Sequence, residues 1–181
     1  CVPIFVDIEE DGFSIDPAKL DNAITPDTCA ILAVHVYGYP CDVDALATYS
    51  EKMGLKLIYD ASHTFGCKYR GRALAGYGDL ATLSFHATKV YHTIEGGGIV
   101  SHNTELATKI KLSTTHGHAF EEYLQVGINA KNSELHAGIG LLNLDTLEEV
   151  ILGRKGIFNQ YLEAFSNKEL FMLDPANYCY C

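Results

Sequence analysis

The sequence has 181 residues, of which 48% are hydrophobic and 20% are charged, and its formal net charge is −10. This length and composition are typical of one globular domain or of a large piece of a bigger one. No basic run stands out among the 13 Lys and Arg residues, which argues against nucleic acid as the main partner because phosphate neutralisation needs clustered cations. An anionic small molecule is compatible with the composition, since a local pocket can oppose the overall charge.

The chain carries no recognisable targeting signal. It has no signal peptide, no apolar run long enough to cross a membrane and no CxxC pair among its six cysteines, so we expect a cytoplasmic protein. It begins at Cys1 and opens directly into an apolar run. We therefore expect the sequence to be part of a longer protein.

Short apolar runs alternate with segments that have helical signals. The runs predict strands at 2–8, 30–36, 55–59, 79–85 and 99–101. Asp16 before Pro17, and Asp42 further on, are typical helix N-caps, and Gly54 is a typical helix end. These signals and the apolar spacing predict helices at 17–24, 43–53, 104–113, 133–149 and 154–165. The alternation predicts an α/β fold with a mostly parallel sheet.

Four polar residues fall at or just beyond the ends of two predicted strands. Asp60 and His63 follow the strand at 55–59, and Ser84 and Lys89 lie at the end of the strand at 79–85. Ligands of parallel sheets collect beyond the carboxyl ends of the strands. We therefore expect these four side chains to converge on one site.

Each of these residues has two interpretations, one purely structural and one chemical. Lys89 is either a solvated surface cation or an amine that forms a Schiff base. Asp60 either caps a turn or holds a proton on the pyridine nitrogen of pyridoxal phosphate, whose ring then acts as an electron sink. His63 is either a core histidine or a donor to the phenolic oxygen of that ring, and Ser84 would bind its phosphate.

Other cofactor and metal sites are disfavoured. The glycines at 96–98 precede a strand instead of opening a helix, and no GxGxxG or Walker pattern is present, which argues against a dehydrogenase or a P-loop enzyme. His116 and His118 form the only tight histidine pair, and no HExxH motif accompanies them. We expect no metal site.

Four polar or glycine-rich segments follow one another along the chain: 60–66 (DASHTFG), 78–89 (GDLATLSFHATK), 95–100 (EGGGIV) and 127–135 (GINAKNSEL). Together and in this order they resemble the DegT/DnrJ/EryC1/StrS family of pyridoxal-phosphate sugar aminotransferases. The resemblance implies fold type I, with a three-layer α-β-α large domain over 1–150 and the start of a small C-terminal domain over 151–181. It also implies that the family's N-terminal strands and phosphate loop lie outside this sequence, so we expect a gap in the sheet beside the strand at 2–8 and an incomplete phosphate site.

The resemblance assigns roles to the four polar residues at the strand ends. Lys89 would form the internal aldimine with pyridoxal 5'-phosphate and later move a proton between the substrate carbon and the cofactor. Asp60 would pair with the pyridine nitrogen and His63 with the phenolic oxygen. Ser84 would bind the phosphate.

Two further residues enter only through the resemblance. Asn129 would reach the phosphate of the cofactor in a neighbouring subunit, which implies a homodimer with shared active sites. Lys131 matches the basic position next to it and would help to hold an anionic substrate.

The function that the resemblance implies is transfer of an amino group from an amino acid, glutamate in our prediction, to a nucleotide-linked keto sugar, in amino-sugar or surface-polysaccharide biosynthesis. One alternative is a sugar dehydrase-like reaction with the same cofactor, although that branch has histidine in place of the lysine found at Lys89. The other alternative is a truncated, non-catalytic homologue that acts by binding or regulation. Tyr37, His86 and Tyr91 are further candidates for contact with the sugar.

Overall fold

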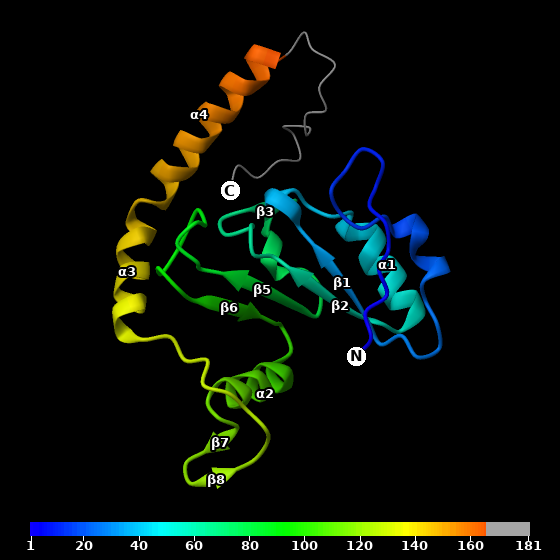
Figure 1. The fold of residues 1–181 in the computed structure, drawn as a ribbon, viewed down its shortest axis with the longest axis vertical. Helices are drawn as coiled ribbons and strands as arrows, with labels where there is room; N and C mark the ends of the chain where they lie inside the picture. The colour runs from blue at the N-terminus through cyan, green and yellow to red at the C-terminus, as the bar shows by residue number, and fades with distance from the viewer. Residues whose placement is uncertain (166–181) are drawn as a thin grey trace.

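A four-stranded sheet forms the centre of residues 1–165, which are the residues described by the structure, a computed structural model (Figure 1). The strand order is β1-β2-β5-β6, and the first three strands are parallel whereas β6 is antiparallel to β5. The sheet and its helices confirm the predicted α/β fold with a mostly parallel sheet. The strands are β1 (Ala30–Val34), β2 (Lys56–Asp60), β5 (Leu80–Ser84) and β6 (Gly97–Val100).

Helix α1 (Val43–Met53) connects β1 to β2 and covers one face of the sheet. The side chain of Asp42 accepts a hydrogen bond from the backbone N–H of Ala45 at 2.9 Å, and Gly54 ends the helix in a left-handed conformation, as predicted. Leu46 from α1 is fully buried in the main core, together with Tyr59 from β2. Burial of this apolar surface holds the helix against the sheet.

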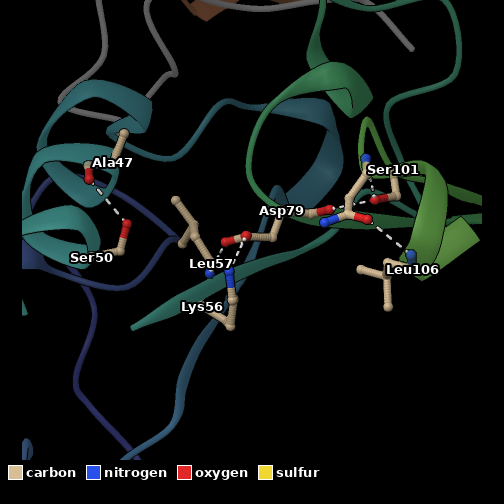
Figure 2. Close-up of polar contacts among 8 residues, drawn as sticks. Ala47, Ser50, Lys56, Leu57, Asp79, Ser101 and Leu106 are labelled. Carbon is tan, nitrogen blue, oxygen red and sulfur yellow. Dashed lines mark hydrogen bonds and ion pairs between the residues drawn. The ribbon is translucent and has the colours of Figure 1, made fainter. Parts of the chain in front are cut away.

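Asp79 ties together the starts of β2 and β5, as Figure 2 shows. Its carboxylate accepts hydrogen bonds from Lys56 Nζ at 2.8 Å and from the backbone N–H of Leu57 at 2.9 Å. Its backbone carbonyl accepts a hydrogen bond from Ser101 Oγ, just after β6, at 2.9 Å. These bonds fix the relative position of three strands, so the opposite ends of β2 and β5 are also aligned.

After β6 the described chain is mainly helical, with one excursion away from the sheet (Figure 1). The predicted break between the last two helices at 150–153 is wrong: the chain breaks at Thr146, between α3 and α4. The predicted domain boundary after residue 150 therefore falls inside a continuous helix; the division itself stays a prediction, and residues 166–181 lie outside the described part. The elements are α2 (Thr104–Thr114), β7 (His118–Ala119), β8 (Glu122–Tyr123), α3 (Glu134–Asp145) and α4 (Leu147–Phe165).

One prediction for the N-terminal region is wrong, and another is confirmed only as a shorter helix of a different type. The run at 2–8 forms no strand: Ile8 makes one isolated bridge to Ile15, while Phe5 is 92% exposed. A strand needs a hydrogen-bonding neighbour, and the described sheet offers none to this run. The sheet therefore ends at β1, and the expected gap between β1 and a strand at 2–8 does not form, because residues 2–8 are not a strand. The predicted helix at 17–24 is a 3-10 helix, η1 (Pro17–Asn22), capped by Asp16 as expected.

Several short elements carry no clear sequence signal. They are η2 (Val36–Gly38), the hairpin of β3 (Lys68–Tyr69) and β4 (Arg72–Ala73), and η3 (Leu74–Gly76). Between residues 1 and 165, no helix is both long enough and apolar enough to cross a membrane.

Candidate functional site

A cavity of about 230 Å³ lies beyond the carboxyl ends of the parallel strands. The segments that follow β1, β2 and β5 all contribute to it, and so does α4. Its walls combine aromatic rings, hydroxyl groups and two cations: Tyr37, Ser62, His63, Phe65, Thr88, Lys89, Val90 and Arg154. Two of the predicted site residues, His63 and Lys89, therefore meet at one cavity.

Lys89 lies half-buried at the end of a turn whose backbone is closed by a hydrogen bond from its N–H to the carbonyl of His86 at 2.9 Å. Its amine makes no hydrogen bond or ion pair with any residue between 1 and 165. A carbonyl compound in the cavity would therefore not have to displace a protein partner to reach this amine.

His63 is held by the chain that follows β1. Its Nδ1 accepts a hydrogen bond from the backbone N–H of Tyr37 at 3.1 Å, and the two rings lie nearly parallel with centroids 6.0 Å apart. Burial lowers the pKa of His63, the positive charge of Lys89 lowers it further, and Asp60 opposes these effects. The neutral ring therefore accepts at Nδ1 and carries its proton on Nε2, where it can act as a donor.

Asp60 is the last residue of β2 and is half-buried. One carboxylate oxygen accepts a hydrogen bond from the backbone N–H of Ser62 at 3.0 Å, whereas the other receives none from the described residues. Asp60 does not line the cavity itself, but its charge raises the pKa of His63, which does. A partly buried carboxylate oxygen in this position would accept a proton donor from a ligand.

His35 lies next to Asp60 and is fully buried. Its backbone N–H donates to the carbonyl of Asp60 at 3.0 Å, and its ring stacks on that of Tyr59 with centroids 4.4 Å apart. Nδ1 accepts from the backbone N–H of Cys41 at 3.1 Å. Burial lowers the pKa of His35 to about 4, although Asp60 partly opposes this, so the ring next to Asp60 is neutral at pH 7.

The other predicted site residues do not line this cavity. Ser84 ends β5, and its Oγ accepts a hydrogen bond from the backbone N–H of His86 at 3.4 Å. Asn129 and Lys131 lie in the chain that pairs with the end of α2, and Lys131 Nζ donates to Asn129 Oδ1 at 2.6 Å. Neither residue contacts Lys89 within the described chain, and their roles stay predictions.

Sequence reasoning missed most of the walls of the cavity. Phe65 stacks on Tyr91 with ring centroids 4.0 Å apart, and Arg154 reaches the cavity from α4. The strand pattern gives no signal for Arg154, because a helix that follows the sheet in sequence can return to it at many places. Tyr37, which the sequence offered as one candidate among several, does line the cavity.

A larger hollow of about 930 Å³ lies between η1 and α1 and contains none of the predicted site residues. Its carboxylates are engaged in part: Asp44 pairs with Arg70 at 2.6 Å and accepts from the Tyr69 hydroxyl at 2.9 Å. We assign the chemistry to the smaller cavity, because the amine of Lys89 and the imidazole of His63 meet there and the charge of Asp60 acts on that imidazole.

Comparison with known proteins gives consistent matches. The model of the DegT/DnrJ/EryC1/StrS aminotransferase family matches residues 1–177. A dTDP-4-amino-4,6-dideoxy-D-glucose transaminase of Shigella dysenteriae is 44% identical over 153 residues, which are 84% of this chain and 42% of the relative. The chain thus spans less than half the length of this relative.

Solved structures of related proteins have the same fold as the described part of this chain. DesI, determined in the presence of its TDP-sugar product, has a TM-score of 0.85 and 36% identity over 92% of this chain and 43% of that one. The PLP-form of a putative sugar aminotransferase, Spr1654 from Streptococcus pneumoniae, has a TM-score of 0.83 and 26% identity over 92% of this chain and 48% of that one. These likenesses establish that the described fold is part of a fold type I aminotransferase.

Proposed function

Because the chain belongs to the DegT/DnrJ/EryC1/StrS aminotransferase family, we propose that the protein uses pyridoxal phosphate to transfer an amino group from an amino acid to a nucleotide-linked keto sugar. The observation that carries this proposal is the meeting of Lys89 and His63 in one cavity next to the carboxylate of Asp60. The relatives are sugar aminotransferases, which supports the reaction class.

The residues at the cavity fit this cofactor. An amine without a protein partner matches an aldehyde, and a carboxylate oxygen without a donor matches a protonated pyridine nitrogen. His63 offers Nε2–H to a phenolic oxygen, since its Nδ1 is already occupied by the backbone of Tyr37. Ser84, at the end of β5, is proposed to bind the phosphate.

The bound cofactor would supply an electron sink for a carbanion. Lys89 would then be the base and acid that moves a proton at the amino-bearing carbon, because its amine lies at the cavity and has no other partner. Asp60 would hold the proton on the ring nitrogen through its negative charge. The rings of Tyr37 and Phe65 would exclude water from the reacting atoms.

We propose a homodimer in which Asn129 reaches the phosphate in the other subunit and Lys131 helps to hold an anionic substrate. Both residues are exposed in the segment that follows β8, and neither lines the cavity of its own chain. This placement supports a role toward another molecule. Combining the subunits of Lys89→Ala and Asn129→Ala, each inactive alone, should restore activity in mixed dimers; no restoration would exclude shared sites.

The substrate proposal is a dTDP-linked keto sugar with glutamate as donor, in amino-sugar or polysaccharide biosynthesis. The dTDP-sugar transaminase of Shigella dysenteriae and the TDP-sugar product in the DesI structure support the nucleotide. The cytoplasmic location stays a prediction from the sequence.

The test uses the protein expressed from its complete reading frame. Pyridoxal phosphate added to it should give a bound, borohydride-reducible chromophore, which Lys89→Ala abolishes and the surface control Lys111→Ala retains. Glutamate should then bleach this chromophore as the cofactor takes up the amino group. A chromophore that glutamate leaves unchanged would exclude transamination and leave a dehydrase-like reaction. A wild-type protein without a chromophore would exclude both reactions and leave a binding or regulatory role.

A further inference from the structure

Helix α4 brings a second cation to the cavity that holds Lys89. Arg154 lines this cavity, and its guanidinium makes no hydrogen bond, ion pair or ring contact with any residue of the described chain. All five of its N–H donors are therefore available to a ligand.

The contact between α4 and the cavity wall fixes the position of this guanidinium. A β-carbon added at Gly66 would lie 3.1 Å from Cδ1 of Ile151, so the helix rests closely on the backbone at this glycine. Ile151 and Arg154 are three residues apart and therefore share one face of the helix. Gly66 directly follows Phe65, which lines the cavity. The seating of Ile151 on Gly66 thus turns Arg154 toward the cavity.

The charge of the cavity is opposite to that of the protein. Among the described residues that line it, two are cations and none is a carboxylate, although the whole chain carries a net charge of −10. The hydroxyls of Ser62 and Thr88 add neutral donors. A local positive site in an acidic protein selects an anion, and a guanidinium matches the two oxygens of a carboxylate or a phosphate.

We propose that Arg154 is a substrate-binding residue that takes an oxyanion of the substrate. The oxyanion is the carboxylate of the amino acid or a phosphate of the nucleotide sugar. This inference rests on the proposed function for the identity of the substrate. Lys89 is reserved for the reacting carbon, so Arg154 is the cation of this cavity that stays available while the reaction proceeds.

The test measures binding of two probes to the complete protein by calorimetry. Glutarate stands for the carboxylate of the donor and thymidine diphosphate for the nucleotide. Arg154→Met keeps the length of the side chain without its charge and should weaken one probe about 10- to 100-fold, as expected for loss of a hydrogen-bonded ion pair. The affinity of Arg154→Lys for that probe should lie between those of the wild type and Arg154→Met. Lys155 is the neighbouring cation that does not line the cavity, so the affinity of Lys155→Met should stay within about twofold of the wild-type value.

A second pair of variants tests the seating of α4. Gly66→Ala should weaken the same probe because it displaces Ile151. Gly71→Ala introduces similar backbone strain, with φ of +79° against +88°, but meets nothing within 4 Å and should bind normally.

The probe that weakens identifies the source of the oxyanion. Unchanged affinity for both probes in Arg154→Met, or an equal loss in Lys155→Met, would overturn the inference, as would a wild-type protein that binds neither probe. The chromophore is recorded in the same samples. Its absence from the wild type would refute the proposed function alone, whereas Arg154→Met should retain it.

Discussion

The backbone N–H of Tyr37 donates a hydrogen bond to Nδ1 of His63 at 3.1 Å, which joins the segment after β1 to the segment after β2. Tyr37 adopts a left-handed conformation with φ of 56°, which is uncommon for a residue other than glycine. This bond fixes which nitrogen of His63 faces the protein. The other nitrogen is therefore the one that a ligand would meet.

The charges on either side of His63 predict two opposite changes in its titration. Lys89→Met removes a positive charge and should raise the pKa of His63, whereas Asp60→Asn removes a negative charge and should lower it. Lys111→Met, on the exposed side of α2, should change nothing. The pKa values are read from the histidine ring signals by NMR in the cofactor-free protein. Shifts of equal sign in the two variants would mean that His63 does not lie between these charges.

The lowered pKa of the buried His35 ring predicts that the protein loses stability in acid. Burial lowers its pKa to about 4 from a usual value of 6.5, against the weaker opposing influence of Asp60. Between these two values the unfolded chain binds a proton that folded His35 refuses, so stability falls as the pH decreases and is independent of this group above pH 6.5. The full loss is about 3 kcal/mol, at about 1.4 kcal/mol for each pH unit.

His35→Asn provides the matched comparison, because an amide oxygen can accept the hydrogen bond from Cys41 that Nδ1 accepts in the native protein. The variant should be less stable at pH 7, since it loses the stack on Tyr59. Its free energy of unfolding, measured with urea at several pH values, should decline less steeply between pH 6.5 and 4. Parallel curves for the two proteins would contradict the assignment of the acid sensitivity to His35.

The parts of the fold that the sequence predicts are those set by local patterns. The runs at 30–36, 55–59 and 79–85 became parallel strands within two residues of their expected ends, because continuous apolar runs with glycine or aspartate stops are typical of buried strands. The same pattern failed at 2–8. Apolar β-branched composition shows that a segment can form a strand, but the hydrogen-bonding neighbour that makes it one is a property of the whole sheet.

The candidate site likewise has features that local sequence patterns predict and features that depend on contacts between distant segments. That Asp60, His63 and Lys89 follow strand ends at one edge of the sheet could be predicted, because the carboxyl ends of parallel strands share one edge, while their roles stay predictions. The contacts that orient them could not: the bond from Tyr37 to His63 depends on a left-handed residue, and Arg154 depends on how α4 rests on Gly66. Hairpins as short as β3 and β4 have too few residues to show any periodicity.

The hydrogen bonds of Asp79 predict how much the stability of the sheet depends on this one carboxylate. Asp79→Ala should cost about 1–2 kcal/mol, mainly because it removes the acceptor of the Leu57 N–H. Asp79→Asn keeps an oxygen for that bond and loses only the exposed pair with Lys56, which should cost less than about 1 kcal/mol. Unfolding by urea measures both. An equal cost in Lys56→Met and Asp79→Ala would show instead that the ion pair dominates.

Two glycines with nearly the same backbone conformation separate strain from steric conflict. Gly54 and Gly78 have φ of +68° and +74°, so alanine at either position should cost about 1 kcal/mol in backbone strain. At Gly54 the added carbon meets nothing within 4 Å. At Gly78 it would lie 2.8 Å from the carbonyl oxygen of Leu57 and 2.9 Å from the ring of Tyr59.

Neither neighbour of Gly78 can move easily, because Tyr59 is fully buried in the core and the N–H of Leu57 is bonded to Asp79. Gly78→Ala should therefore cost about 1–3 kcal/mol more than Gly54→Ala, the usual penalty for overpacking. Denaturant unfolding of the two variants gives this difference directly. Equal losses would mean that the turn before β5 relaxes away from β2, and that the alignment of their far ends does not depend on this close approach.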